Sequence, residues 1–155
     1  MNKNSDDKEK MHAIRHALQE RHILIAWKPE YDLGISILDE QHRGIVTAIN
    51  SFYFSMQNRR GVNMLSPVIG MVNDYARIHF EAEEEFHAKC GFPDAKNHHA
   101  LHLELIDSTA RIQKQSMENR DPQQLMHFLK DWWINHICDK DRVFHDYLVK
   151  MSRHG

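Results

Sequence analysis

Two pairs of potential metal ligands stand at one-turn spacing in this sequence. His79 and Glu83 are four residues apart, and so are His98 and His102. In an α-helix, residues four apart lie on the same face, so each pair can direct two donor atoms to one point. Imidazole and carboxylate donors together suit iron, zinc, copper or manganese better than calcium or magnesium. The spacing therefore predicts a transition-metal site.

Both pairs lie on predicted apolar helical faces. Apolar residues within 68–90 recur at steps of three and four, and His79 and Glu83 fall in that series. His98 and His102 begin a second series of the same rhythm. The alternative interpretation is that these are core polar residues satisfied by hydrogen bonds. Buried charges are normally paired or bound to metal, and two such pairs on successive helices favour a metal site.

Other histidines have a weaker case as ligands. His42 leads the apolar series of its own segment, where a lone histidine is more often a hydrogen-bonded core residue. His12 and His16 share the one-turn spacing, but no apolar series encloses them and no third ligand is evident. His87, one turn beyond Glu83, is expected near the edge of the apolar face, in a structural or supporting role.

The composition indicates one cytoplasmic domain. A chain of 155 residues can bury a substantial core. A net charge of −2 and a pI near 6.7 give no electrostatic indication of nucleic-acid or membrane-surface binding. No apolar run approaches the length of a membrane span, and the charged N-terminus does not resemble a signal peptide. Cys90 and Cys138 are expected to be reduced core thiols.

Four long helices are needed to position the candidate ligands. Their start and stop signals predict helices over residues 39–58, 66–90, 94–117 and 121–148. No strand pattern or phosphate-binding glycine loop appears in the sequence. Short links between long helices predict an all-α, up-down-up-down four-helix bundle, a fold that holds metal sites in its interior.

The predicted helix starts rest on capping signals. Asp39 and Ser66 are the expected N-caps of the first two helices, and Pro67 follows Ser66 at the first helical position. Asp121-Pro-Gln-Gln124 combines an N-cap, a first-turn proline and a capping-box residue.

The segments outside the helices are predicted to be peripheral. Residues 1–26 form a polar extension that can hold a short helix. Residues 27–38, interrupted by proline and glycine, indicate an extended arm packed on the core. We expect the bundle domain to span residues 27–150, with residues 151–155 as a C-terminal tail.

The last helix offers two candidate carboxylate partners for His136. Asp139 is three residues on, roughly 60° away around a regular helix, whereas Asp141, five on, is about 140° away. Regular helical geometry therefore favours Asp139. Only a local distortion such as a π-bulge would bring Asp141 to the same point as His136.

Taken together, the motifs resemble those of the hemerythrins, particularly the single-domain bacteriohemerythrins. The resemblance covers about residues 27–150, and the order of its elements is highly specific although each alone is not. Those elements are Trp27 with Asp32-Leu-Gly34, Asp39-x-Gln41-His42, His79-x3-Glu83, Gly91-Phe-Pro-Asp94, His98-x3-His102, and Trp132 with His136-Ile-x3-Asp141.

The resemblance implies two non-haem iron ions held by five histidines and two carboxylates. It implies that one iron is bound by His98, His102 and His136, and the other by His42 and His79. The carboxylates of Glu83 and Asp141 bridge the two irons, together with an oxo or hydroxo group. The family pattern thus favours Asp141 over Asp139.

This ligand count implies how oxygen binds. Two six-coordinate irons keep one position open, on the iron with two histidines, as catalytic metal sites keep a free position. A histidine-rich site favours Fe(II) and reversible O2 binding, with O2 held end-on as hydroperoxide. An apolar wall around it is expected from Ile45, Phe80, Trp133 and Ile137.

We therefore expect a cytoplasmic O2-binding protein for storage or delivery, most simply a monomer, that supplies an O2-consuming enzyme and is not itself an enzyme. One alternative is an O2 or redox sensor read by a partner protein. Others are a di-iron oxidase, peroxidase or nitric oxide reductase, and an iron store. Extra carboxylate ligands or a substrate-sized channel would favour an enzyme, and the ligand inventory shows neither.

Overall fold

The structure, a computed structural model, describes the backbone of residues 3–154 and their side chains except those of residues 3–5, 16–21 and 154. Within this range the chain forms helices and connecting segments and no strand, which confirms the all-α prediction. In chain order the elements are α1 (Lys3–His22), the 3-10 turn η1 (Pro29–Tyr31), α2 (Ser36–Gln57), α3 (Gly61–Cys90), α4 (Ala95–Asn119), α5 (Pro122–Trp132), the π segment η2 (Trp133–Lys140) and α6 (Asp141–His154).

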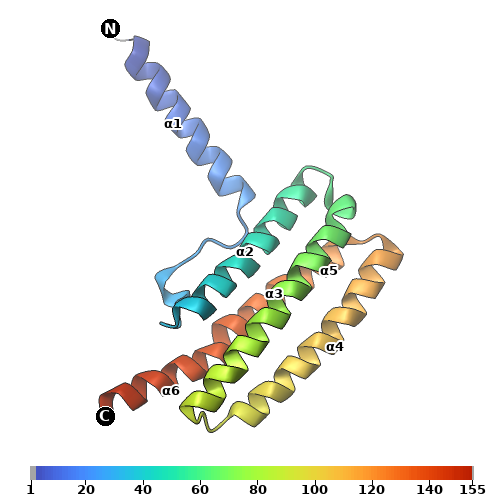
Figure 1. The fold of residues 1–155 in the computed structure, drawn as a ribbon. Helices are drawn as coiled ribbons and strands as arrows, with labels where there is room; N and C mark the ends of the chain where they lie inside the picture. The colour runs from blue at the N-terminus through green and yellow to red at the C-terminus, as the bar shows by residue number, and fades with distance from the viewer. Residues whose placement is uncertain (1–2, 155) are drawn as a thin grey trace.

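Four helical columns form the bundle (Figure 1). Helices α2, α3 and α4 are three of them, and α5, η2 and α6 follow one another without a break as the fourth. Helix α3 packs on both α2 and α4, and α5 closes the ring by packing on α4 and α2. This is the up-down-up-down arrangement that the short links predicted.

The apolar core lies inside this ring. Its fully or almost fully buried members include Ile49 and Phe52 of α2 and Leu125 and Leu129 of α5. Burying a side chain of this size contributes roughly 1.5–3 kcal/mol. The core therefore fixes how the helices face one another, and with that where their polar inward residues meet.

Helix α2 begins three residues before its predicted start. It starts at Ser36, and Asp39 does not cap its N-terminus. The Asp39 carboxylate instead accepts hydrogen bonds from the backbone N–H groups of Leu33 at 2.6 Å and Gly34 at 3.2 Å. The prediction of Asp39 as N-cap was wrong because this carboxylate ties down the preceding segment.

Helix α3 also begins earlier than predicted. It starts at Gly61, so Ser66 is not its N-cap and Pro67 lies inside the helix. The helical hydrogen-bond series is already under way before the proline, since Met64 N–H donates to the Arg60 carbonyl at 3.2 Å. Pro67 removes one backbone donor, and the helix continues past it.

Two other helix ends follow the sequence signals. Gly91 ends α3 with a φ of 63°, a left-handed conformation that glycine adopts without steric cost. Asp121 caps α5, and its carboxylate accepts from the N–H groups of Gln123 at 2.9 Å and Gln124 at 3.4 Å. The Asp121 N–H donates to the Ser116 carbonyl at 2.9 Å, so Gln124 does not complete the predicted capping box.

The N-terminal segments differ in how they meet the bundle. Helix α1 is longer than the short helix predicted and extends away from the bundle (Figure 1). The arm that follows is irregular except for η1, and it packs on the core as predicted. Trp27 and Tyr31 place their rings 5.9 and 5.4 Å from that of Trp133. At the other end, α6 continues to His154, so residues 151–154 prolong the last helix.

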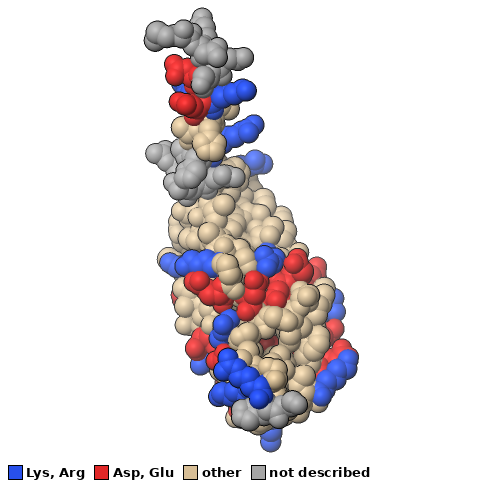
Figure 2. Space-filling model, turned by 90° about the vertical axis from the view of Figure 1, so that its left-hand side faces the viewer, with Lys and Arg blue, Asp and Glu red and all other residues tan. Residues whose placement is uncertain are grey.

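Acidic and basic side chains intermingle over the lower half of the bundle face shown in Figure 2, and the part of this face next to α1 is mostly uncharged. None of the helices that the structure describes combines the length and the apolar character needed to cross a bilayer.

Candidate metal centre

A cluster of histidines and carboxylates occupies the interior of the bundle. All seven predicted ligands are buried, with at most 4% of their surface exposed. They come from every column: His42 from α2, His79 and Glu83 from α3, His98 and His102 from α4, His136 from η2 and Asp141 from the start of α6.

Asp141 lies between two groups of imidazoles. Its Oδ2 atom is 3.2 Å from Nε2 of His42 and 3.3 Å from Nε2 of His79. Its Oδ1 atom is 3.2 Å from Nε2 of His98 and 3.3 Å from Nε2 of His136. Each carboxylate oxygen of one residue therefore faces a different pair of histidines.

Glu83 favours one side of the cluster. Its Oε2 atom is 3.1 Å from Nε2 of both His98 and His102, and 4.0 Å from Nε2 of His79. Its Oε1 atom has no hydrogen-bond partner among the described residues. In this structure Glu83 is thus in close contact with the histidines of α4 and more distant from that of α3.

The donor atoms form two groups that share Asp141. Within each group all donor atoms lie within 4.8 Å of one another: Glu83, His98, His102, His136 and Asp141 in the first, and His42, His79 and Asp141 in the second. We call these the five-residue group and the three-residue group. The histidines divide between them as the family resemblance implied, while Glu83 belongs only to the larger group.

The π segment η2 brings Asp141 to His136. In a π-helix the hydrogen bonds run from i to i+5, and the Asp141 N–H donates to the His136 carbonyl. Asp139, the partner that regular helical geometry favoured, is 66% exposed and pairs with Lys140 at 2.9 Å. Regular helical geometry does not apply here because the helix is locally wider than an α-helix, so Asp141, the residue that the family pattern favoured, faces His136.

Unpaired buried atoms indicate that the cluster fits metal ions. Nε2 of His102 and of His136, Oε1 of Glu83 and Oδ1 of Asp141 have no hydrogen-bond partner among the described residues. Three of the four lie 3.1–3.3 Å from a facing atom, so they are in ion-pair contact without forming a hydrogen bond. Metal ions would satisfy these atoms, and iron accepts both imidazole and carboxylate ligands.

Both carboxylates are held ionised by their neighbours. Burial alone raises the pKa of Glu83, but the imidazoles of His102 and His98 outweigh burial and lower it to about 2. Burial also raises the pKa of Asp141, yet the adjacent His136 and the hydrogen bond from His42 bring it well below its usual range. Ionised carboxylates are the form that binds metal.

The histidines differ in their protonation. Burial lowers the pKa of His136 to about 4, so its imidazole is neutral and ready to bind a metal. Burial also acts to lower the pKa of His98, but the adjacent carboxylates of Asp141 and Glu83 prevail and raise it to about 10. His98 therefore carries a proton in the metal-free protein, and metal binding has to displace it.

Two residues outside the predicted set orient the ligands. Nδ1 of His102 donates to the Glu84 carboxylate at 2.8 Å, and the same oxygen is 2.8 Å from Nδ1 of His99. Nδ1 of His79 donates to Oε1 of Gln41 at 3.3 Å. A partner on Nδ1 fixes the tautomer of an imidazole and leaves Nε2 free for a metal.

Gln41 stands in one of the motifs that carry the family resemblance, but no role was assigned to it, and Glu84 stands in none. Glu84 directly follows the predicted ligand Glu83, and Gln41 directly precedes His42. Neither position falls on an apolar helical series, so periodicity gave no reason to select it. Their partners lie on other helices, which only the fold brings close.

His87 is buried, contrary to the expectation that it lies at the edge of the apolar face. It is 1% exposed, and its ring packs against Phe92, Phe144 and His98. The buried face of α3 continues from Glu83 to His87 in a step of four, while Phe86 is half-buried. Burial lowers the pKa of the His87 imidazole.

The four residues predicted to form an apolar wall are all buried in the core: Ile45, Phe80, Trp133 and Ile137. Phe80 stacks on His102, with 3.9 Å between ring centroids and 15° between ring planes. Trp133 approaches His42 edge-on at 6.3 Å. These two aromatic rings therefore directly border the cluster.

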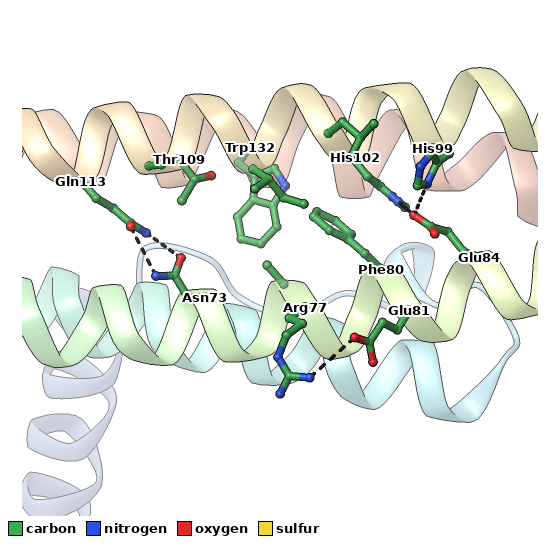
Figure 3. A pocket seen from close by; sticks show the side chains of 14 residues that line it. Asn73, Arg77, Phe80, Glu81, Glu84, His99, His102, Thr109, Gln113 and Trp132 are labelled. Carbon is green, nitrogen blue, oxygen red and sulfur yellow. Dashed lines mark hydrogen bonds and ion pairs between the residues drawn. The ribbon is translucent and has the colours of Figure 1, made fainter.

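A surface pocket of about 510 Å³ opens between α3 and α4 (Figure 3). Phe80, His102 and Trp132 line it, and the Asn73–Gln113 and Arg77–Glu81 pairs contribute polar groups. The pocket therefore reaches residues that also border the metal cluster.

The pair His12 and His16 forms no metal site that can be described. His12 is exposed on α1, and the side chain of His16 lies outside the described residues.

The structure is a four-helix bundle whose interior holds two groups of imidazole and carboxylate donors, and the two groups share Asp141. These are the features of a metal-binding bundle protein. The chain belongs to the hemerythrin family, because the Hemerythrin HHE cation binding domain matches residues 33–148. The match confirms the fold class and the resemblance noted in the sequence. Members of this family bind a non-haem di-iron centre, and the cluster of histidines and carboxylates could hold such metal ions.

Relatives extend the match over most of the chain. A bacteriohemerythrin of Stenotrophomonas maltophilia is 28% identical over 124 residues, which cover 79% of this chain and 80% of that protein. A bacteriohemerythrin of Clostridium acetobutylicum is 26% identical over 129 residues, covering 79% and 100%. A hemerythrin-like protein of Naegleria gruberi is 26% identical over 118 residues, covering 76% and 88%.

Proposed function

We propose that this protein binds O2 reversibly at a di-iron centre, for storage or delivery, and that it is not an enzyme. The observation that carries the proposal is the division of the buried donors into two unequal groups joined by Asp141. Two iron ions held at such a centre would supply the electrons for taking up O2 and would recover them when O2 leaves.

The proposed ligands follow from the two groups. His98, His102 and His136 would hold one iron and His42 and His79 the other, with Asp141 shared between them. Glu83, a donor of the five-residue group alone, is proposed as the second bridge because the family resemblance implies it. The four contacts of Asp141, all 3.2 or 3.3 Å, support its bridging role. The three-residue group offers fewer protein donors, and a metal with fewer protein ligands keeps a position for a small molecule.

The apolar neighbours would keep that position dry. We propose Ile45, Phe80, Trp133 and Ile137 as the wall, on the support of their burial and of the ring contacts of Phe80 and Trp133 with ligand histidines. Excluding water limits the delivery of protons to bound oxygen. The proposed role of these residues is therefore to make oxygen uptake reversible.

Residues 27–150 would form the functional unit, most simply as a monomer, with residues 1–26 as an extension and an O2-consuming enzyme as the recipient. Cys90 and Cys138 are free and half-buried, which supports a reducing compartment such as the cytoplasm. The exposed Met11 and Ile14 on α1 offer apolar contacts to a partner, so a sensor read by another protein stays an alternative.

An enzyme of the di-iron oxidase type is the second candidate, and the pocket between α3 and α4 favours it. Its volume of about 510 Å³ lies in the usual range of small-molecule sites. It also reaches His102, a member of the five-residue group. The Phe80–His102 stack stands where this pocket meets the cluster and would have to move for a substrate to reach the metals.

One experiment separates these functions. Iron-loaded protein is reduced without air and then cycled between air and argon while visible absorbance and iron content are recorded. A charge-transfer band that appears in air and disappears under argon over repeated cycles supports reversible binding. A single irreversible oxidation, or turnover of peroxide or nitric oxide, rejects it in favour of an enzyme or sensor.

A further inference from the structure

His87 is a buried histidine that the proposed ligand set leaves unused. It lies one turn after Glu83 on α3 and is 1% exposed. Neither of its ring nitrogens has a hydrogen-bond partner among the described residues. An unpaired buried polar group costs about 1–3 kcal/mol, and an apolar side chain of similar shape would avoid that cost. Packing alone therefore does not explain why a histidine occupies position 87.

The surroundings of the His87 ring point to one polar neighbour. Phe144 and Phe92 pack against the ring, with centroids 4.4 and 4.7 Å away, and His98 approaches edge-on at 4.9 Å. Nε2 of His87 lies 3.7 Å from Oε1 of Glu83. That oxygen has no hydrogen-bond partner in the described part of the chain either. A buried donor and a buried acceptor, both unpaired, thus face each other just beyond hydrogen-bond distance.

We propose that His87 is the positioning residue of Glu83. Its Nε2–H donates a hydrogen bond to Oε1 of Glu83 in the metal-loaded protein, which directs the other oxygen, Oε2, towards His98 and His102. The present 3.7 Å is about 0.8 Å longer than a hydrogen-bond length of about 2.9 Å. The inference rests on the proposed function only through the role of Glu83 as a ligand.

The orientation of the Glu83 carboxylate determines how it meets the two metal positions. Oε2 of Glu83 already lies 3.1 Å from two histidines of the five-residue group and 4.0 Å from His79. A hydrogen bond from His87 holds the carboxylate in that orientation. It therefore strengthens the five-residue position, and the second lone pair of Oε1 stays available for the proposed bridging contact with the other metal.

The test compares three variants with the wild type. His87→Leu removes the donor, His87→Gln keeps an N–H donor, and Phe92→Leu disturbs packing on the same ring without touching a polar group. Zn²⁺ is titrated into each metal-free protein against a competing chelator. The unfolding temperature is recorded for the metal-free and the Zn²⁺-loaded forms.

We expect His87→Leu to weaken the tighter Zn²⁺ position about 10–100-fold, the usual effect of losing a partner of a metal ligand. His87→Gln should retain affinity within a few-fold, and Phe92→Leu should leave it unchanged. His87→Leu should not lower the unfolding temperature of the metal-free protein, because it removes unpaired buried atoms. In the Zn²⁺-loaded protein it should lower it.

Equal Zn²⁺ affinity in the wild type and His87→Leu would overturn the inference, as would an equal loss in Phe92→Leu. Ring ¹⁵N NMR of the Zn²⁺-loaded wild type tests the proposal without a variant, because it shows which nitrogen of His87 carries the proton. A proton on Nε2 agrees with the proposal, and a proton on Nδ1 alone contradicts it. If the protein binds two metal ions in a way that depends on His87 but shows no reversible O2 cycles, the proposed function is rejected and this inference stands. Absence of Zn²⁺ binding in the wild type rejects both.

Discussion

Oδ1 of Asp141 lies 3.3 Å from Nε2 of His136, although the two residues are five apart on one continuous helical column. The π segment between them brings the two side chains together. With its other oxygen, Oδ2, Asp141 reaches His42 and His79. Its Oδ1 atom also lies 3.2 Å from Nε2 of His98 on α4, so a single carboxylate connects all four columns of the bundle. Its loss should affect both metal positions.

We predict that Asp141→Asn binds metal more than about 100-fold more weakly, beyond the usual effect of a supporting residue. Asparagine keeps the size of the side chain but loses the charge that two metal positions share. Iron content after anaerobic loading measures the effect. Asp139→Asn is the matched control, since Asp139 is exposed and pairs with Lys140, and it should load like the wild type. A similar loss in both variants would contradict the bridging role.

Glu83→Ala should lose iron and also destabilise the metal-free bundle. It removes the carboxylate that His98 and His102 contact at 3.1 Å inside the protein. Removing one partner of a buried ion pair costs about 3–5 kcal/mol. Urea unfolding of metal-free protein measures this cost. Glu85→Ala, which removes an exposed carboxylate paired with Lys89, should stay within about 0.5 kcal/mol of the wild type. Normal iron content in Glu83→Ala would refute its assignment as a ligand.

Glu84→Ala should weaken metal binding without unfolding the bundle. The Glu84 carboxylate fixes the His102 ring through Nδ1 at 2.8 Å. Losing such a partner typically costs 10–100-fold in metal affinity, or roughly 1.4–2.7 kcal/mol. Competition against a chelator measures the change. Glu81→Ala on the same helix, whose carboxylate is 70% exposed and pairs with Arg77, should show no effect. Equal affinities in the two variants would mean that the contact does not support the metal.

Phe80→Leu should shorten the life of the oxygen-bound state several-fold. The Phe80 ring stacks on His102 at the boundary between the cluster and the pocket of α3 and α4. A smaller, non-planar side chain opens that boundary to water, which promotes irreversible oxidation. The decay of the visible band in air gives the rate. Ile106→Ala changes an exposed residue of the same pocket and should leave the decay unchanged. An unaltered decay in Phe80→Leu would remove Phe80 from the wall.

Much of the site was readable from the sequence because its spacing is local. The pairs His79–Glu83 and His98–His102 share a helical face by the geometry of any α-helix. The Asp121 cap acts on the backbone two and three residues ahead, so it too could be recognised from the sequence alone. The short links then left an antiparallel bundle as the natural arrangement. These features depend on the chain near each residue.

The tertiary structure decided what depends on contacts between distant segments. Asp141 rather than Asp139 faces the cluster because packing accommodates a π segment, whose width no regular periodicity predicts. His87 is buried because phenylalanines from outside α3 cover it, and Glu84 meets His102 only where α3 lies beside α4. The sequence by itself determined the helices and the types of ligand. The packing of the helices determined which carboxylate connects the two groups and which residues support them, since those relationships join atoms far apart along the chain.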